Sequence, residues 1–158
     1  FDEVSTIKAI KDWCNDPMLH EKHIRVFQSL PNPVNVLTTH SAWLMSSLVM
    51  GANGLLSGAG SVIAPLQVRL FNAIKNNNLE EAKDINDKIF PLVQLFYKPP
   101  FLDMHNRMKE TLVILNAIQK AVVRPPLMKL PLKEIEELKK TVNNINLDNK
   151  LNFVKTVA

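Results

Sequence analysis

Three short strand signals, each followed by a helical segment, lie in the first half of the chain, and only helical signals follow them. The strand signals span residues 5–11, 34–38 and 55–57. Strands that alternate with helices at this spacing predict βαβ units and a parallel sheet, since parallel neighbours need a crossover connection. Three such strands leave sheet edges and apolar faces uncovered. We therefore expect the chain to need a partner that completes its sheet.

The helical segments are marked by capping residues and prolines. Asp16 followed by Pro17 predicts a helix start, because aspartate caps helix N-termini and proline fits the first helical position. Asn78 and Glu81 form a second such start, with asparagine as the cap. On these grounds we expect helices over residues 17–30, 41–50, 62–75, 79–97 and 102–119, and an amphipathic one after Pro131.

Composition excludes several classes of protein. The chain has 158 residues, of which 46% are apolar, as is normal for a soluble domain. Its formal charge of +4 is spread among interspersed Lys and Glu, so we expect no nucleic-acid partner, which would require clustered basic residues. No apolar run approaches the roughly 18 residues of a membrane span. We therefore expect no membrane partner.

A single cysteine, Cys14, excludes an internal disulfide framework and suits a reducing compartment. Because the sequence places no base beside it, we expect Cys14 to be a structural thiol. The chain starts at Phe1 rather than at a methionine, so we expect the natural N-terminus and any targeting segment to lie further upstream. The cytoplasm or an organelle matrix is the expected location.

Lys11 ends the first predicted strand, on the same face as Ile7 and Ala9, because side chains alternate along a strand. A lysine that ends an apolar face is costly unless it is solvated, paired or chemically employed. A buried lysine shifts its pKa downward readily, and a neutral amine can attack a ketone to form a Schiff base. On this residue alone, a solvated lysine at a strand end is the plainer interpretation.

The segment from Ile7 to Asp12 resembles the Schiff-base lysine motif of the dihydrodipicolinate synthase and N-acetylneuraminate lyase family. Residues 36–41 and 51–58 resemble the next two strand ends of that family, and the helical remainder resembles its C-terminal helices. The resemblance covers residues 5–145. It implies an α/β fold, the C-terminal part of a (β/α)8 TIM barrel, with strands six to eight in residues 1–76 and a helical extension in residues 77–158.

The resemblance also implies a chemistry. Lys11 would attack the ketone of a 2-oxo acid, and the protonated imine would act as an electron sink for aldol cleavage, condensation or dehydration, with no cofactor or metal. Thr39, Ser57 and Gly58 would bind the substrate beside the imine, as catalysis in such barrels sits at the C-terminal strand ends. His40 also follows a strand end, where lining the pocket and packing elsewhere explain it equally well.

Departures from the family pattern narrow the expected substrate. Trp13 stands where sialate lyases have a small hydroxyl residue, and Ser41 and Ala42 stand where they hold the sugar's glycerol tail with acidic residues. His40 takes a position that is usually acidic in dihydrodipicolinate synthases. A short 2-oxo acid or a 2-oxo-3-deoxy sugar acid therefore fits better than sialic acid.

Other histidines and the tryptophans have plainer interpretations. His20 and His23 are three residues apart on one helix, a spacing that a metal pair can use, but no third ligand is near them in sequence. We expect them to be solvated, and His105 to lie at a surface or an interface. Trp13 and Trp43 are expected to pack in the core.

The expected partners follow from the half-barrel. The family's proton shuttle and carboxylate-binding loop belong to earlier strands, so the missing N-terminal half is one partner, and the isolated chain is expected to be inactive. Further copies, in a dimer or tetramer, are another. The alternative is a non-catalytic fragment or paralogue that acts in assembly or binding.

Overall fold

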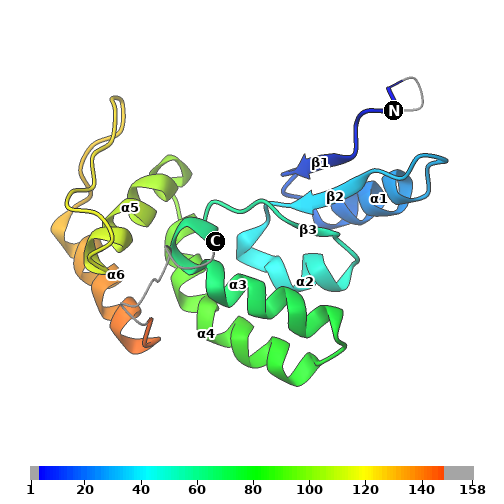
Figure 1. Ribbon diagram of the computed structural model, residues 1–158. Coiled ribbons are helices and arrows are strands. Elements are labelled where there is room, and N and C mark those ends of the chain that lie inside the picture. The colour runs from blue at the N-terminus through cyan, green and yellow to red at the C-terminus, as the bar shows by residue number, and fades with distance from the viewer. Residues whose placement is uncertain (1–3, 148–158) are drawn as a thin grey trace, which may run out of the picture. The chain divides into compact units, whose positions relative to one another are not determined.

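Three parallel strands form one sheet in the order β1–β2–β3 (Figure 1). The computed structural model describes residues 4–147. β1 spans Ala9–Asp12, β2 spans Asn35–Thr38 and β3 spans Gly54–Leu55. Lys11 pairs with Leu37, and Leu37 pairs with Gly54. The prediction of a small parallel sheet between helices is confirmed.

The first and third strands differ from the predicted ranges. β1 starts at Ala9 and not at residue 5, because the preceding backbone forms a turn in which the Ile7 N–H donates to the Val4 carbonyl at 3.3 Å. β3 ends at Leu55 rather than at Ser57, whose carbonyl accepts from the Gly60 N–H at 3.2 Å where the next helix begins. Local apolar runs therefore predicted the strands but not their ends.

The two faces of the sheet differ in what covers them. Val36 and Thr38 are fully buried on the face that helix α1, Pro17–Gln28, covers with Ile24. Asp12 is buried on this same face, because it pairs with Thr38 in the parallel register. Lys11 precedes Asp12 and so lies on the other face, where its side chain is exposed.

Helix starts follow the predicted capping chemistry. The Asp16 side chain accepts hydrogen bonds from the backbone N–H groups of Met18 and Leu19, at 2.9 and 3.1 Å. Asn78 and Glu81 exchange hydrogen bonds of 3.1 and 3.2 Å at the start of helix α4, Leu79–Tyr97. These two helices therefore begin where a capping residue satisfies free backbone donors.

The remaining helices follow the expected order, with a 3-10 turn before two of them. The 3-10 turns are η1, Ser41–Trp43, and η2, Phe101–Asp103; the helices are α2, Leu44–Val49; α3, Gly60–Lys75; α4, Leu79–Tyr97; α5, Met104–Ile114; and α6, Leu132–Asn144. The helix expected over residues 102–119 stops at Ile114, because Asn116 adopts a left-handed conformation with φ of 57°. Within residues 4–147, every helix is too short or too polar to cross a membrane.

Two compact units make up the chain, and they divide between Phe90 and Pro91, within α4. The domain boundary predicted after residue 76 stays a prediction about family architecture. In the second unit the fully buried Arg107 donates to Glu134 at 2.5 Å and to the Lys98 carbonyl at 2.6 Å. These bonds satisfy its charge, so Arg107 organises the packing of α5 and α6.

Candidate functional site

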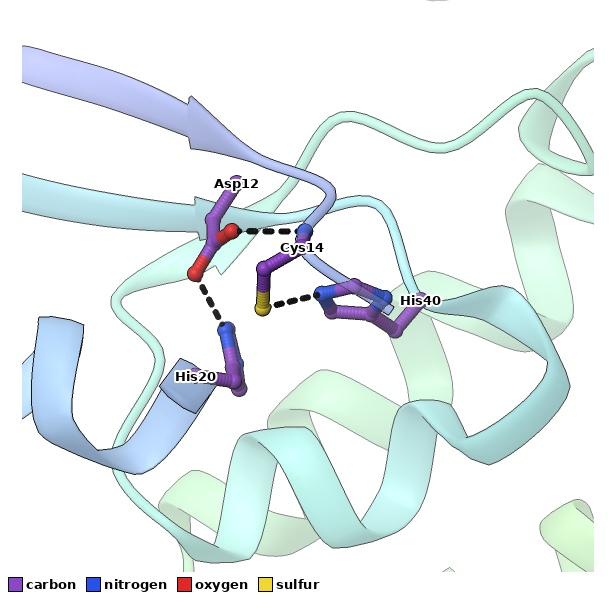
Figure 2. Close-up of side chains that lie close together, drawn as sticks. All are labelled: Asp12, Cys14, His20 and His40. Carbon is purple, nitrogen blue, oxygen red and sulfur yellow. Dashed lines mark hydrogen bonds and ion pairs between the residues drawn. The ribbon is translucent and has the colours of Figure 1, made fainter. Parts of the chain in front are cut away.

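The carboxyl ends of β1 and β2 bring together polar side chains from separate segments of the first unit (Figure 2). Asp12, at the end of β1, is only 5% exposed. Its Oδ2 lies 2.7 Å from His20 Nδ1 and 2.9 Å from His23 Nδ1, both on α1. Its Oδ1 accepts from the Cys14 backbone N–H at 3.0 Å. Three donors therefore surround one buried carboxyl group.

The pKa of Asp12 reflects this environment. Burial alone would raise the pKa, but the hydrogen bonds from His20, His23 and Cys14 together lower it from 3.8 to about 2. The group is thus a carboxylate at neutral pH, ready to accept hydrogen bonds or bind a cation.

His20 is fully buried between Asp12 and Ser47 of α2. Because a carboxylate can only accept, His20 Nδ1 carries the proton in the hydrogen bond to Asp12. His20 Nε2 lies 2.7 Å from the Ser47 hydroxyl, which can either donate or accept. Both ring nitrogens are therefore satisfied inside the fold, and the expectation that His20 is solvated was wrong.

His40 is the second buried histidine of the cluster, at 3% exposure. Its ring stacks on Trp43, with centroids 4.2 Å apart and an interplanar angle of 14°, and it meets His20 edge-on at 4.9 Å. His40 Nε2 lies 3.8 Å from Cys14 Sγ, whereas Nδ1 has no hydrogen-bond partner in the part of the chain that the structure describes. Burial, and next the charge of His20, lower the pKa of His40 to about 4.

Cys14 lies between His40 and the backbone of Asp16. Its Sγ lies 3.3 Å from the Asp16 carbonyl and faces His40. Burial, together with the nearby Asp12 charge, raises the pKa of this thiol, so the pair is not an activated nucleophile at neutral pH. A base does lie beside Cys14, contrary to the sequence-based expectation, because His40 follows a different strand.

The residues predicted to bind substrate follow neighbouring strands. The Thr39 hydroxyl donates to the Leu56 carbonyl at 2.8 Å, next to Ser57. Ser57 accepts from Gln67 Nε2 at 3.0 Å and contacts the Ser41 hydroxyl, and Gly58 follows it. Thr39 and Ser57 are thus on adjacent segments at the same end of the sheet as Lys11.

Three other predictions have clear outcomes. Trp13 is 45% exposed, so the expectation that it packs in the core was wrong. Trp43, also expected in the core, is only partly buried and packs on His40. His105 is exposed, which confirms its expected surface position.

Neither Asp12 nor Ser47 was predicted as a site residue. A signal for part of the cluster was nevertheless present: His20 and Ile24 are four residues apart and share one helix face, and Ile24 is apolar. Alternation along β1 also places Asp12 on the face opposite Lys11. Neither pattern reveals that the α1 face with His20 packs against the sheet face with Asp12.

Comparison with known proteins gives one family and several solved structures that share one fold. The model of the dihydrodipicolinate synthetase family matches residues 2–145. The 4-hydroxy-tetrahydrodipicolinate synthase 2 of Clostridium acetobutylicum is 24% identical over 98 residues, which are 62% of this chain and 33% of that protein. The match therefore involves only part of the relative.

Solved structures share the fold of this chain. The prophage protein YagE of E. coli K12, of the dihydrodipicolinic acid synthase family, has a TM-score of 0.80 at 22% identity, covering 93% of this chain and 49% of its own. The dihydrodipicolinate synthase of Bacteroides thetaiotaomicron has a TM-score of 0.79 at 21% identity, with coverages of 90% and 48%. The N-acetylneuraminate lyase of Fusobacterium nucleatum has a TM-score of 0.74 at 21% identity, with coverages of 91% and 47%. The chain thus spans about half the length of these structures.

Proposed function

We propose that this chain, which belongs to the dihydrodipicolinate synthetase family, forms the C-terminal part of a Schiff-base lyase. In this proposal β1, β2 and β3 are strands six to eight of a (β/α)8 barrel, and the later helices form an extension. The enzyme acts on a short 2-oxo acid or a 2-oxo-3-deoxy sugar acid. The chain supplies the reactive lysine, Lys11.

The position of Lys11 carries the proposal. The residue lies at the carboxyl end of β1, the end at which barrel enzymes place their active sites. Its side chain is exposed on the face that α1 leaves uncovered, which in a closed barrel is the interior. An amine there can meet a substrate, whereas the neighbouring Asp12 on the opposite face is enclosed by helices.

The reaction begins when the Lys11 amine attacks the ketone carbon of the 2-oxo acid. Loss of the carbonyl oxygen as water leaves a protonated imine at C2. In aldol cleavage the imine accepts the electron pair of the C3–C4 bond and becomes an enamine. In dehydration it accepts the pair of a C3–H bond, whose proton passes to a base, and the enamine then expels the C4 hydroxyl group, which leaves as water after it takes up a proton. Condensation runs through the same imine in reverse. Because the imine is the electron sink, the proposed reaction needs no metal or cofactor.

The proposed substrate pocket rests on Thr39, Ser57 and Gly58. The hydrogen bond from the Thr39 hydroxyl to the Leu56 carbonyl holds two strand ends side by side. Their backbone can therefore form a rigid wall of the substrate pocket. The contacts of His40 with Trp43 and Cys14 argue against a substrate contact for this histidine. The remaining pocket groups, in this proposal, come from the N-terminal half of the barrel, and copies of the whole protein assemble as a dimer or tetramer.

Borohydride trapping tests this function in the intact protein that contains the chain. Incubation with pyruvate and borohydride should reduce the imine to a stable amine and add the substrate's mass to the peptide containing Lys11. Lys11→Ala should lose both the adduct and the activity. Lys8→Ala, at another exposed lysine of the same segment, is the matched control and should keep both. Activity retained in Lys11→Ala, with no adduct on wild-type Lys11, would refute the proposal.

A further inference from the structure

Four side chains with metal-binding atoms gather at the carboxyl ends of β1 and β2 (Figure 2). One of them, Asp12, lies on the helix-covered face of the sheet, opposite the face of Lys11. Each of the four offers one ligand atom, and these atoms all lie within 4.8 Å of one another; the residues are Asp12, Cys14, His20 and His40. We propose that they bind a zinc ion in a closed, four-coordinate structural site. The proposal goes beyond the Schiff-base chemistry and does not depend on it.

The donor set suits zinc. Thiolate, imidazole and carboxylate groups are the protein ligands of Zn²⁺, with bonds of about 2.0–2.3 Å in a tetrahedral arrangement. Ligand atoms around such an ion lie roughly 3.3–3.8 Å apart. The distance from Asp12 Oδ2 to His20 Nδ1 is 2.7 Å, and the distance from Cys14 Sγ to His40 Nε2 is 3.8 Å. Small adjustments of side chains would therefore open space for the ion.

Hydrogen bonds from neighbouring groups would orient two of the four ligands, His20 and Asp12. When Nδ1 of His20 binds the metal, its proton moves to Nε2, where the Ser47 hydroxyl, now an acceptor, stays within hydrogen-bond distance at 2.7 Å. His23 and the Cys14 backbone N–H hold the Asp12 carboxylate. Metal-ligating histidines and carboxylates are typically oriented by outer partners of this kind.

The burial of His40 is a second, independent observation. His40 Nε2, in a side chain that is 3% exposed, has only the long 3.8 Å contact to Cys14 Sγ. A buried polar atom with so weak a partner destabilises a fold. A bond from Nε2 to a metal ion would replace that contact with a strong one, and stacking on Trp43 holds the ring in place. Nδ1, on the other side of the ring, has no hydrogen-bond partner within residues 4–147 and keeps none when the ion is bound.

Zinc at this place would join four parts of the fold. Asp12 ends β1, Cys14 lies in the connection that follows it, His20 belongs to α1, and His40 follows β2. Binding replaces the thiol proton of Cys14, which passes to solvent, by a Zn–S bond, and no electrons are transferred. The half-buried Cys14 provides the route by which the ion enters.

Calorimetry with zinc, on the intact and tag-free protein, tests the site. Wild type should bind one zinc ion through these residues, and Cys14→Ser and His40→Gln should each weaken binding at least about tenfold. Ser47→Ala, in the second layer, should weaken it about 10–100-fold. His105→Gln, at the exposed histidine, and Lys11→Ala should bind as tightly as wild type.

Cobalt substitution decides the question without any variant that could fail to fold. Co²⁺ bound by Cys14 and the histidines should show a thiolate charge-transfer band in the near ultraviolet and the intense visible bands of a tetrahedral site. A wild-type spectrum without a thiolate band, or zinc affinity unchanged in both Cys14→Ser and His40→Gln, overturns the proposal. Imine trapping at Lys11 is measured separately, so failure of either proposal is distinguishable from failure of the other.

Discussion

Replacing His40 with phenylalanine should remove much of the protein's sensitivity to mild acid. His40 is 3% exposed, and burial, with the charge of His20 as the next cause, lowers its pKa from 6.5 to about 4. At about 1.4 kcal/mol per pKa unit, this difference corresponds to about 3 kcal/mol of the free energy of unfolding.

The direction follows from proton binding. Because the pKa of His40 is lower in the folded state, the unfolded chain binds more protons between pH 6.5 and about pH 4. The stability that depends on an uncharged His40 is therefore fully present above pH 6.5. It is lost as the pH falls toward 4, where both states become protonated.

Denaturant unfolding of the zinc-free protein, with a chelator present, measures the effect at pH 7.5 and pH 4.5. Wild type should lose about 2–3 kcal/mol from this group over that interval. His40→Phe keeps a ring against Trp43 and should lose correspondingly less. His105→Phe adds the same ring at an exposed position and controls for the phenyl group itself. An equal loss of stability in wild type and His40→Phe would refute this account of His40.

Three further substitutions test the fold, each by its free energy of unfolding. Asp16→Ala removes the α1 cap and should cost about 1 kcal/mol, and an unchanged stability would contradict its capping role. Gly51→Ala should cost about 1–3 kcal/mol because φ is +110° there, although the added methyl would have room; a neutral outcome would show that the backbone relaxes. Arg107→Ala removes the ion pair with Glu134 and the hydrogen bonds to the Phe96 and Lys98 carbonyls, and should cost about 3–5 kcal/mol; a cost under about 1 kcal/mol would contradict the packing role given to Arg107.

The order of the elements was readable from the sequence because short-range chemistry determines it. Asp16 with Pro17, and Asn78 with Glu81, start helices through hydrogen bonds to residues within one turn. Strand ends were less predictable, because a residue such as Ile7 is a strand residue only if a neighbouring strand is there to pair with it. Ile7 instead lies in a turn with Val4, and no strand pairs with it within the described residues.

The buried cluster could not be predicted in the same way. His20 contacts Asp12 across eight positions in the chain, and His40 lies beside Cys14 across twenty-six. Such pairs depend on the register of β1 against β2 and on the rotation of α1, neither of which composition or spacing determines. Sequence resemblance instead pointed to Lys11, whose position depends only on one strand and its end.

Adjacent residues of β1 thus separate two kinds of chemistry, with the lysine on the open side and the carboxylate on the helix side. Inserting or deleting one residue within residues 9–12 would turn every later side chain of the strand to the opposite side. The amine would then be enclosed among histidines and the carboxylate would take its place on the open face. The length of this segment therefore has almost no freedom during evolution or design.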